Sequence, residues 1–197
     1  MDIKKIVNFI FEINQLKKQK TSGWRLIGVD VPPSNADHTL RAAQIGYILA
    51  AMEGNPNPER VTTILVVHEN GEARIGDQNK VSAKYYNKSE GENQAFRDQS
   101  NNLGEEIEKK WNIYFEEFEN RNTPEGVIAK DADWLETAFQ AKEYLDLGHK
   151  DAQNWIDNVE KSLETESAKK LLEEMKNTKF TEWWKDLKKM TYTKLEK

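Results

Sequence analysis

The sequence predicts an all-α protein, a helical bundle of one domain. Three observations support this prediction. Apolar side chains return every three or four positions along most of the chain, which is the period of an amphipathic helix. Breakers such as Gly23, Pro32-Pro33 and Gly148 separate these periodic segments. A length of 197 residues suits one domain, and with 37% hydrophobic residues the chain can form a core.

The expected elements follow this periodicity. Helices are predicted over residues 6–20, 36–52, 58–67, 89–101, 104–119, 124–147, 151–162, 166–177 and 180–190. Residues 24–31 are expected to form an extended connector, and residues 69–88 are polar and expected to be irregular. We predict a core of residues 1–150, with residues 151–197 as C-terminal helices that pack on the same domain.

The third helix is predicted from its first residues. Asn57 is placed to cap it, and Pro58 suits its first position. The run Ile64–Val67 is rich in β-branched residues and would also suit a strand, but no neighbouring strand exists to pair with it. A helix is therefore expected here. Gly148 is expected to cap the end of a later helix.

Composition excludes several classes of function. Without cysteine the chain has no disulfide, no thiolate nucleophile and no Cys-ligated zinc site. The 29 basic and 34 acidic residues are mixed, so no basic stripe predicts a nucleic-acid polymer as partner. The apolar stretches are too short to span a membrane, and the first residues show no secretory signal. The expected location is the cytoplasm.

Three histidines are present, and two of them stand beside carboxylates. His38 follows Asp37, and His68 ends the run Ile64–Val67 and precedes Glu69. Consecutive helical residues point roughly 100° apart, near the angle between adjacent ligands on one metal. Imidazole with carboxylate suits Mn, Fe, Co, Ni or Zn. On spacing alone, His38 and His68 are either metal ligands or satisfied core histidines.

Further carboxylates extend this pattern. Glu72 and Asp77 add acids to the loop after His68. Asp131 and Asp133 lie among apolar residues on a later helix, where a buried acid needs a partner and a metal is one solution.

The ordered elements from Leu16 to about Leu147 resemble the HD-domain 5′-deoxynucleotidase family. The matching segments are Leu16-Lys17, Gly23-Trp24, Ser34-Asn35-Ala36-Asp37-His38, the stretch His68–Asp77, Lys130-Asp131-Ala132-Asp133 and Gln140-Ala141. The resemblance implies the HD-type all-α fold, a homodimer, and release of phosphate from nucleoside 5′-monophosphates, with deoxynucleotides favoured. It also implies one divalent metal, with Mg possible beside the transition metals. The implied ligands are His38, His68, Glu69 and Asp133, the last because it is the fourth residue of the Lys-x-x-Asp element that begins at Lys130.

The resemblance also assigns roles to the acids and to the substrate contacts. Glu72 would position or deprotonate the attacking water, or protonate the leaving alkoxide. Asp77 would orient substrate or water. Trp24 either stacks on a nucleobase or closes the core over the connector. Lys130 either reaches phosphate or pairs with a neighbouring acid.

Two positions depart from the family pattern. The family has His-Asp where this chain has His68-Glu69, and an arginine where this chain has Ile27. Because positions two apart on an extended segment face the same way, Arg25 is the expected substitute for that arginine. The departures motivate an alternative from another class, an inactive protein that binds a nucleotide or a partner. A nucleoside triphosphohydrolase on the same scaffold is a further alternative.

Overall fold

The computed structural model describes residues 2–187, and this part of the chain folds into helices without a β-strand. The α-helices are α1 (Ile3–Ile13), α2 (Asn35–Glu53), α3 (Pro58–Val67), α4 (Glu72–Ile75), α5 (Lys88–Ser100), α6 (Glu105–Asn120), α7 (Pro124–Asp146), α8 (Gln153–Ser162) and α9 (Glu166–Asn177). Short 3₁₀-helices cover Asn14–Lys17, Ser22–Ile27, Ser82–Lys84, Lys150–Ala152 and Glu182–Trp184. The predicted all-α class is confirmed.

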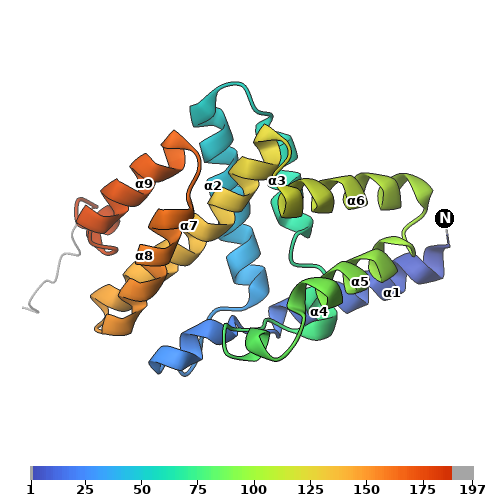
Figure 1. The fold of residues 1–197 in the computed structure, drawn as a ribbon, viewed down its shortest axis with the longest axis horizontal. Helices are drawn as coiled ribbons and strands as arrows, with labels where there is room; N and C mark the ends of the chain where they lie inside the picture. The colour runs from blue at the N-terminus through green and yellow to red at the C-terminus, as the bar shows by residue number, and fades with distance from the viewer. Residues whose placement is uncertain (1, 188–197) are drawn as a thin grey trace, which may run out of the picture.

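Helix α7 lies at the centre of the bundle, where it contacts α2, α3, α6, α8 and α9 (Figure 1). Small side chains on α7 are fully buried and let its neighbours approach closely: Ala129, Ala132, Ala138 and Ala141. Gly46 on α2 has the same effect, because a Cβ there would collide with Leu65 and Val61 of α3. Close packing therefore fixes α2, α3 and α7 relative to one another.

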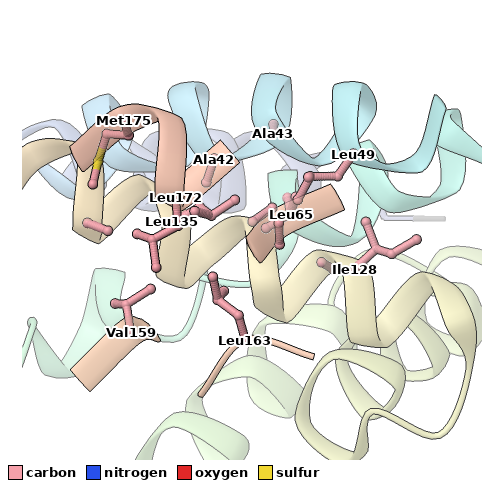
Figure 2. Close-up of a cluster of buried hydrophobic side chains, with 14 of the residues drawn as sticks. Ala42, Ala43, Leu49, Leu65, Ile128, Leu135, Val159, Leu163, Leu172 and Met175 are labelled. Atoms are coloured by element: carbon pink, nitrogen blue, oxygen red, sulfur yellow. The ribbon is translucent and has the colours of Figure 1, made fainter. Parts of the chain in front are cut away.

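One hydrophobic core connects the central helices to the C-terminal ones (Figure 2). Leu135 of α7 and Ala42 of α2 lie in the same cluster as Val159 of α8 and Leu172 and Met175 of α9. The helices after residue 150 therefore bury their apolar faces on the same core. The division of the chain at residue 150 stays a prediction.

Helices α2 and α3 begin where capping side chains satisfy their first N–H groups. Ser34 and Asp37 form a reciprocal capping box at the start of α2. The side chain of Asn57 accepts a hydrogen bond of 2.9 Å from the backbone N–H of Arg60, and Pro58 occupies the first turn of α3. The β-branched end of α3 is helical, as predicted.

Three expectations in the N-terminal half were wrong in whole or in part. Residues 69–88 are not irregular throughout, because they contain α4 and the 3₁₀-helix Ser82–Lys84. Residues 22–27 form a 3₁₀-helix rather than an extended connector, and Gly28 ends it with a φ of 83°. The backbone N–H of Val29 bonds back to the carbonyl of Trp24 at 3.2 Å, which holds the segment in a tight turn. The first α-helix ends at Ile13, earlier than expected, and continues as the 3₁₀-helix Asn14–Lys17.

The expectation for residues 180–190 was wrong as far as the structure describes them. They contain the 3₁₀-helix Glu182–Trp184, and positions 188–190 lie outside the described residues. Trp183 and Trp184 are exposed, so neither packs in the core of the described residues. No helix in the described range 2–187 is both long and apolar enough to cross a bilayer.

Candidate active site

Four side chains from α2, α7 and the end of α3 converge on one point. His38 comes from α2, Asp133 from α7, and His68 and Glu69 directly follow α3. One ligand atom from each of the four lies within 4.8 Å of the others. The Nε2 atom of His38 is 3.1 Å from Oδ1 of Asp133, and that of His68 is 3.2 Å from Oε1 of Glu69. The structure thus brings together the residues expected to be metal ligands.

The orientation of His68 shows that this cluster fits a metal. Its Nδ1 lies 2.6 Å from the carbonyl oxygen of Leu65, so that nitrogen carries the proton. Its Nε2 therefore faces the cluster, and within residues 2–187 this buried atom makes no hydrogen bond, although Oε1 of Glu69 lies 3.2 Å away. When the ring is neutral, the lone pair of Nε2 is available to a metal. A buried polar atom without a partner is rare in proteins and calls for an explanation. Two imidazoles and two carboxylates form a donor set that suits a divalent transition metal.

The surrounding carboxylates raise the pKa of both imidazoles. Burial lowers the pKa of His38, but hydrogen bonds to Asp133 and Glu136 outweigh that effect and hold the pKa well above its usual value. Burial also lowers the pKa of His68, yet the negative charges of Glu69 and Asp133 raise it to about 9. A proton and a metal ion compete for these nitrogens, so metal affinity is expected to rise with pH.

Glu72 lies beside this cluster at the first position of α4. It is 3% exposed and accepts hydrogen bonds from the amide of Asn35 and the ammonium group of Lys88, whose Nζ is 2.7 Å from Oε1. The same amide of Asn35 donates to Glu69 at 3.2 Å. Burial and the negative charge of Glu69 raise the pKa of Glu72, whereas Lys88 opposes this rise. The contacts with Asn35 and Lys88 hold Glu72 next to the cluster.

Asp77 lies on the loop after α4 and faces the same space. Its carboxylate accepts a short hydrogen bond from the backbone N–H of Ser22, and Lys88 Nζ is 3.9 Å from its Oδ1. The hydroxyl of Ser22 also donates to the backbone carbonyl of Asp77 at 3.2 Å. Lys88 thus stands between the two acids expected to be catalytic, Glu72 and Asp77.

The cluster opens into a cavity of about 440 Å³, a size typical of small-molecule sites. Its walls combine the candidate ligands with Glu72 and Asp77, with cationic side chains, and with aromatic rings. The cationic residues are Lys80, Lys88 and Lys130, and the aromatic ones include Trp24 and Trp155. A cavity with acids at one place and cations and rings around it can hold an anionic molecule that carries a planar group.

Trp24 is mainly a core residue, although it also lines the cavity. It is 5% exposed and packs against Tyr144 and Trp155, with ring centres 5.2 and 5.1 Å away. Its role in closing the core is visible in these contacts. Stacking on a nucleobase stays a prediction.

Lys130 pairs with a neighbouring acid and also lines the cavity. Its Nζ is 3.4 Å from Oδ2 of Asp133 and 4.0 Å from the centre of the Phe118 ring. Of the two roles considered for it, the contact with an acid is the one the structure displays.

The structure does not bring Arg25 to the site. Its side chain is exposed, and it does not line the cavity. The expected substitution for the family arginine assumed an extended segment. Because three residues make one turn of a 3₁₀-helix, Arg25 and Ile27 point roughly 240° apart rather than the same way.

Asp131 is a structural residue rather than a ligand. Its oxygens accept hydrogen bonds from the backbone N–H groups of Glu164 and Thr165 and from the hydroxyl of Thr165, at 2.7 to 3.2 Å. Thr165 is the N-cap of α9, so Asp131 fixes the start of that helix to α7. This agrees with the choice of Asp133 over Asp131 as the candidate ligand.

Sequence reasoning missed three polar side chains at the site: Asn35, Lys88 and Glu136. Asn35 precedes His38 by three residues and Glu136 follows Asp133 by three, so helical spacing places each on the face of a candidate ligand. That spacing could have indicated both. No pattern in the sequence marks Lys88, because a loop of irregular structure brings it to Glu72.

The family of this chain follows from its match to known proteins. A family model described as HD domain matches residues 13–176, which is most of the chain. The chain therefore belongs to the HD domain family.

Several proteins that are similar to this chain share the name 5′-deoxynucleotidase. A 5′-deoxynucleotidase HDDC2 of Dictyostelium discoideum is 32% identical over 66% of this chain and 72% of its own length. The 5′-deoxynucleotidase hdd1 of Schizosaccharomyces pombe is 32% identical over 71% of this chain and 72% of its own length. The human 5′-deoxynucleotidase HDDC2 is 28% identical over 75% and 72% of the two chains.

Solved structures share the fold. A conserved hypothetical protein from Pyrococcus furiosus superposes with a TM-score of 0.75 and 31% identity, over 87% of this chain and 99% of its own. The structure of a predicted metal-dependent phosphohydrolase from Magnetospirillum magnetotacticum superposes with a TM-score of 0.67 over 89% of this chain and 91% of its own. At 18% identity it shows the shared fold alone.

Proposed function

We propose that this chain is a metal-dependent phosphohydrolase that releases inorganic phosphate from deoxynucleoside 5′-monophosphates. One observation carries the proposal: the cluster of His38, His68, Glu69 and Asp133 opens into a cavity that Glu72 also lines. The names of the relatives, which are 5′-deoxynucleotidases, support the class of substrate.

The four clustered residues would hold one divalent metal, with Mn, Co, Fe, Ni or Zn suited to the donors and Mg possible. A bound metal of this kind supplies polarisation of a phosphate oxygen and a lowered pKa for bound water. Glu69 replaces the aspartate of the family pattern and is longer by one methylene. Its Oε1 still lies 3.2 Å from Nε2 of His68, so its carboxylate reaches the cluster.

The remaining residues would position the substrate and move protons. Glu72 is placed to take a proton from the attacking water or to give one to the leaving alkoxide, and Asn35 and Lys88 hold its carboxylate in place. Asp77 would orient substrate or water from the opposite side of Lys88. The cations that line the cavity provide positive charge for phosphate, and the aromatic rings provide apolar surface for the base.

The test is release of phosphate from a panel of deoxy- and ribonucleoside 5′-monophosphates. Protein stripped with a chelator is resupplied separately with Mn, Co, Zn or Mg. We expect metal-dependent release that is faster with deoxynucleotides. For the variant Glu72→Gln, the matched control is Glu117→Gln, because Glu117 is also a buried glutamate but pairs with Arg60 and does not line the cavity. No release with any metal from the wild-type protein would contradict the proposal.

Two outcomes of the same assay point to the alternatives. Release of triphosphate or pyrophosphate from nucleoside triphosphates, without release from monophosphates, would assign a triphosphohydrolase. A protein silent on both classes that gains turnover on Glu69→Asp would be an inactive binding member of the family. Loss of metal from an active parent on the same substitution would refute that second alternative.

The proposal includes a homodimer in the cytoplasm. The side chains of Ile3, Ile10 and Phe11 on α1 are exposed, and such an apolar face can pack against a second copy. The molar mass in solution, measured by light scattering, checks the dimer. Cell fractionation checks the location, which we infer from the class of substrate.

A further inference from the structure

The imidazole of His38 is held from both sides by carboxylates of α7. Its Nε2 faces Asp133 at 3.1 Å, and its Nδ1 makes a short hydrogen bond with Oε2 of Glu136. Glu136 is 4% exposed and follows Asp133 by one helical turn. One helix therefore supplies a candidate metal ligand and also the group that orients another candidate ligand.

The second oxygen of Glu136 is held by Arg41 of α2. The Nε of Arg41 donates to Oε1 of Glu136 at 2.9 Å. The same guanidinium donates to Glu143 at 2.5 Å and to Gln140 at 3.0 Å. Each oxygen of the Glu136 carboxylate thus has its own partner, so the carboxylate cannot rotate without breaking a contact. The positive charge of Arg41 also offsets the cost of burying the negative charge.

The two histidines of the cluster differ in this respect. His68 donates its Nδ1 proton to a neutral backbone carbonyl, that of Leu65. His38 faces an anionic carboxylate through the same atom. A carboxylate in this position fixes the tautomer with a proton on Nδ1, leaves Nε2 free to bind a metal, and makes the imidazole a stronger donor.

We propose that Glu136 and Arg41 are a positioning pair that sets the affinity of the metal site through His38. Neither residue belongs to the four that would bind the metal directly. The pair acts by holding the His38 ring at the angle and in the tautomer that direct Nε2 to the cluster. This inference rests on the metal site of the proposed function, and it does not depend on the substrate.

The test is the metal dissociation constant, measured by calorimetric titration of chelator-stripped protein with Mn and separately with Zn. Glu136→Gln keeps the size of the side chain and removes its charge. We expect it to weaken binding by about 10- to 100-fold, the range found for groups that orient metal ligands. Arg41→Met is expected to have a smaller effect of the same sign. Glu143→Gln is the matched control, because it removes a contact of Arg41 without touching His38, and its affinity should equal that of the wild type.

A second measurement separates positioning from a general loss of structure. Because the chain has three histidines, long-range ¹H–¹⁵N spectra of the zinc-loaded protein contain the signals of three imidazole rings, which are readily distinguished. In Glu136→Gln the ¹⁵N shifts of His38 should change, whereas those of His68 should stay. If Glu136→Gln does not fold, Arg41→Met gives the same readouts.

The outcomes distinguish this inference from the proposed function. Equal affinities and equal His38 shifts in Glu136→Gln, Arg41→Met and Glu143→Gln would overturn the positioning role while leaving the metal site intact. A wild-type protein that binds neither Mn nor Zn would overturn the metal site itself, and with it this inference.

Discussion

Two aspartates of α7, only two residues apart, have different surroundings. Asp131 points to the start of α9, and Asp133 points to the cluster between α2 and α3. Residues two apart on a helix project roughly 200° from each other, so the two carboxylates leave α7 on opposite sides. Both are buried or nearly so.

The difference between them lies in their partners. Asp131 accepts hydrogen bonds from backbone N–H groups and a hydroxyl, which satisfy its charge within the protein. Within residues 2–187, the carboxylate of Asp133 pairs with ionisable side chains, those of His38, His68 and Lys130. A buried carboxylate surrounded by imidazoles and further carboxylates is suited to a cation, whereas one surrounded by N–H donors is a helix cap. The type of partner therefore separates the candidate metal ligand from the acid that caps a helix.

The largest expected effect is that of Asp133→Asn. Loss of the metal removes several kcal/mol of charge stabilisation in the transition state, so phosphate release should fall by about 10³-fold or more. Initial rates with a deoxynucleoside monophosphate, at an Mn concentration that saturates the wild type, measure this. If Asp131→Asn lowers the rate per folded molecule as much, the two positions do not differ in the way described.

Glu72→Gln should have the next largest effect on the rate. Loss of a general acid or base lowers kcat by about 10²- to 10⁴-fold. Because Glu72 is not one of the four clustered residues, the bound metal should remain at the wild-type stoichiometry. Metal analysis together with kcat checks both parts, and full activity of Glu72→Gln would remove Glu72 from the mechanism.

Asp131→Ala should lower stability and spare activity. It leaves the buried N–H groups at the start of α9 without an acceptor, which costs about 1–3 kcal/mol in the free energy of unfolding. Urea unfolding measures the loss, and kcat below the midpoint should equal that of the wild type. An unchanged midpoint would show that Asp131 is not a cap that matters for stability.

The smallest effect is expected for Thr165→Ala. Its side chain caps α9 and also donates to Asp131, and removal of an N-cap costs about 1 kcal/mol. The loss should be partly contained in that of Asp131→Ala, so the double variant should lose less than the sum of the two. Additive losses would indicate that the two residues act independently.

Much of the helical framework could be predicted from the sequence because its signals are local. Asn57 and Pro58 marked the start of α3, and Gly148 marked the end of α7, and the structure confirms both. The prediction for the segment 22–27 was wrong because the hydrogen bonds that hold its turn include one from Ser22 to the distant Asp77. No local pattern contains that contact.

The candidate site was predictable only in part. The resemblance to an ordered family pattern identified the four clustered residues, which periodicity alone left ambiguous. Lys88 was not visible, because it reaches Glu72 through the fold of an irregular loop. The direction predicted for Arg25 assumed an extended segment, whereas residues 22–27 form a 3₁₀-helix.

The most direct test of the metal site is a calorimetric titration of Mn into chelator-stripped wild-type, Asp133→Asn and Asp131→Asn proteins. We expect one bound ion for the wild type and for Asp131→Asn, and no binding for Asp133→Asn at the same concentrations. Equal binding by Asp133→Asn and the wild type would contradict this expectation, because the cluster around Asp133 would then not be the metal site.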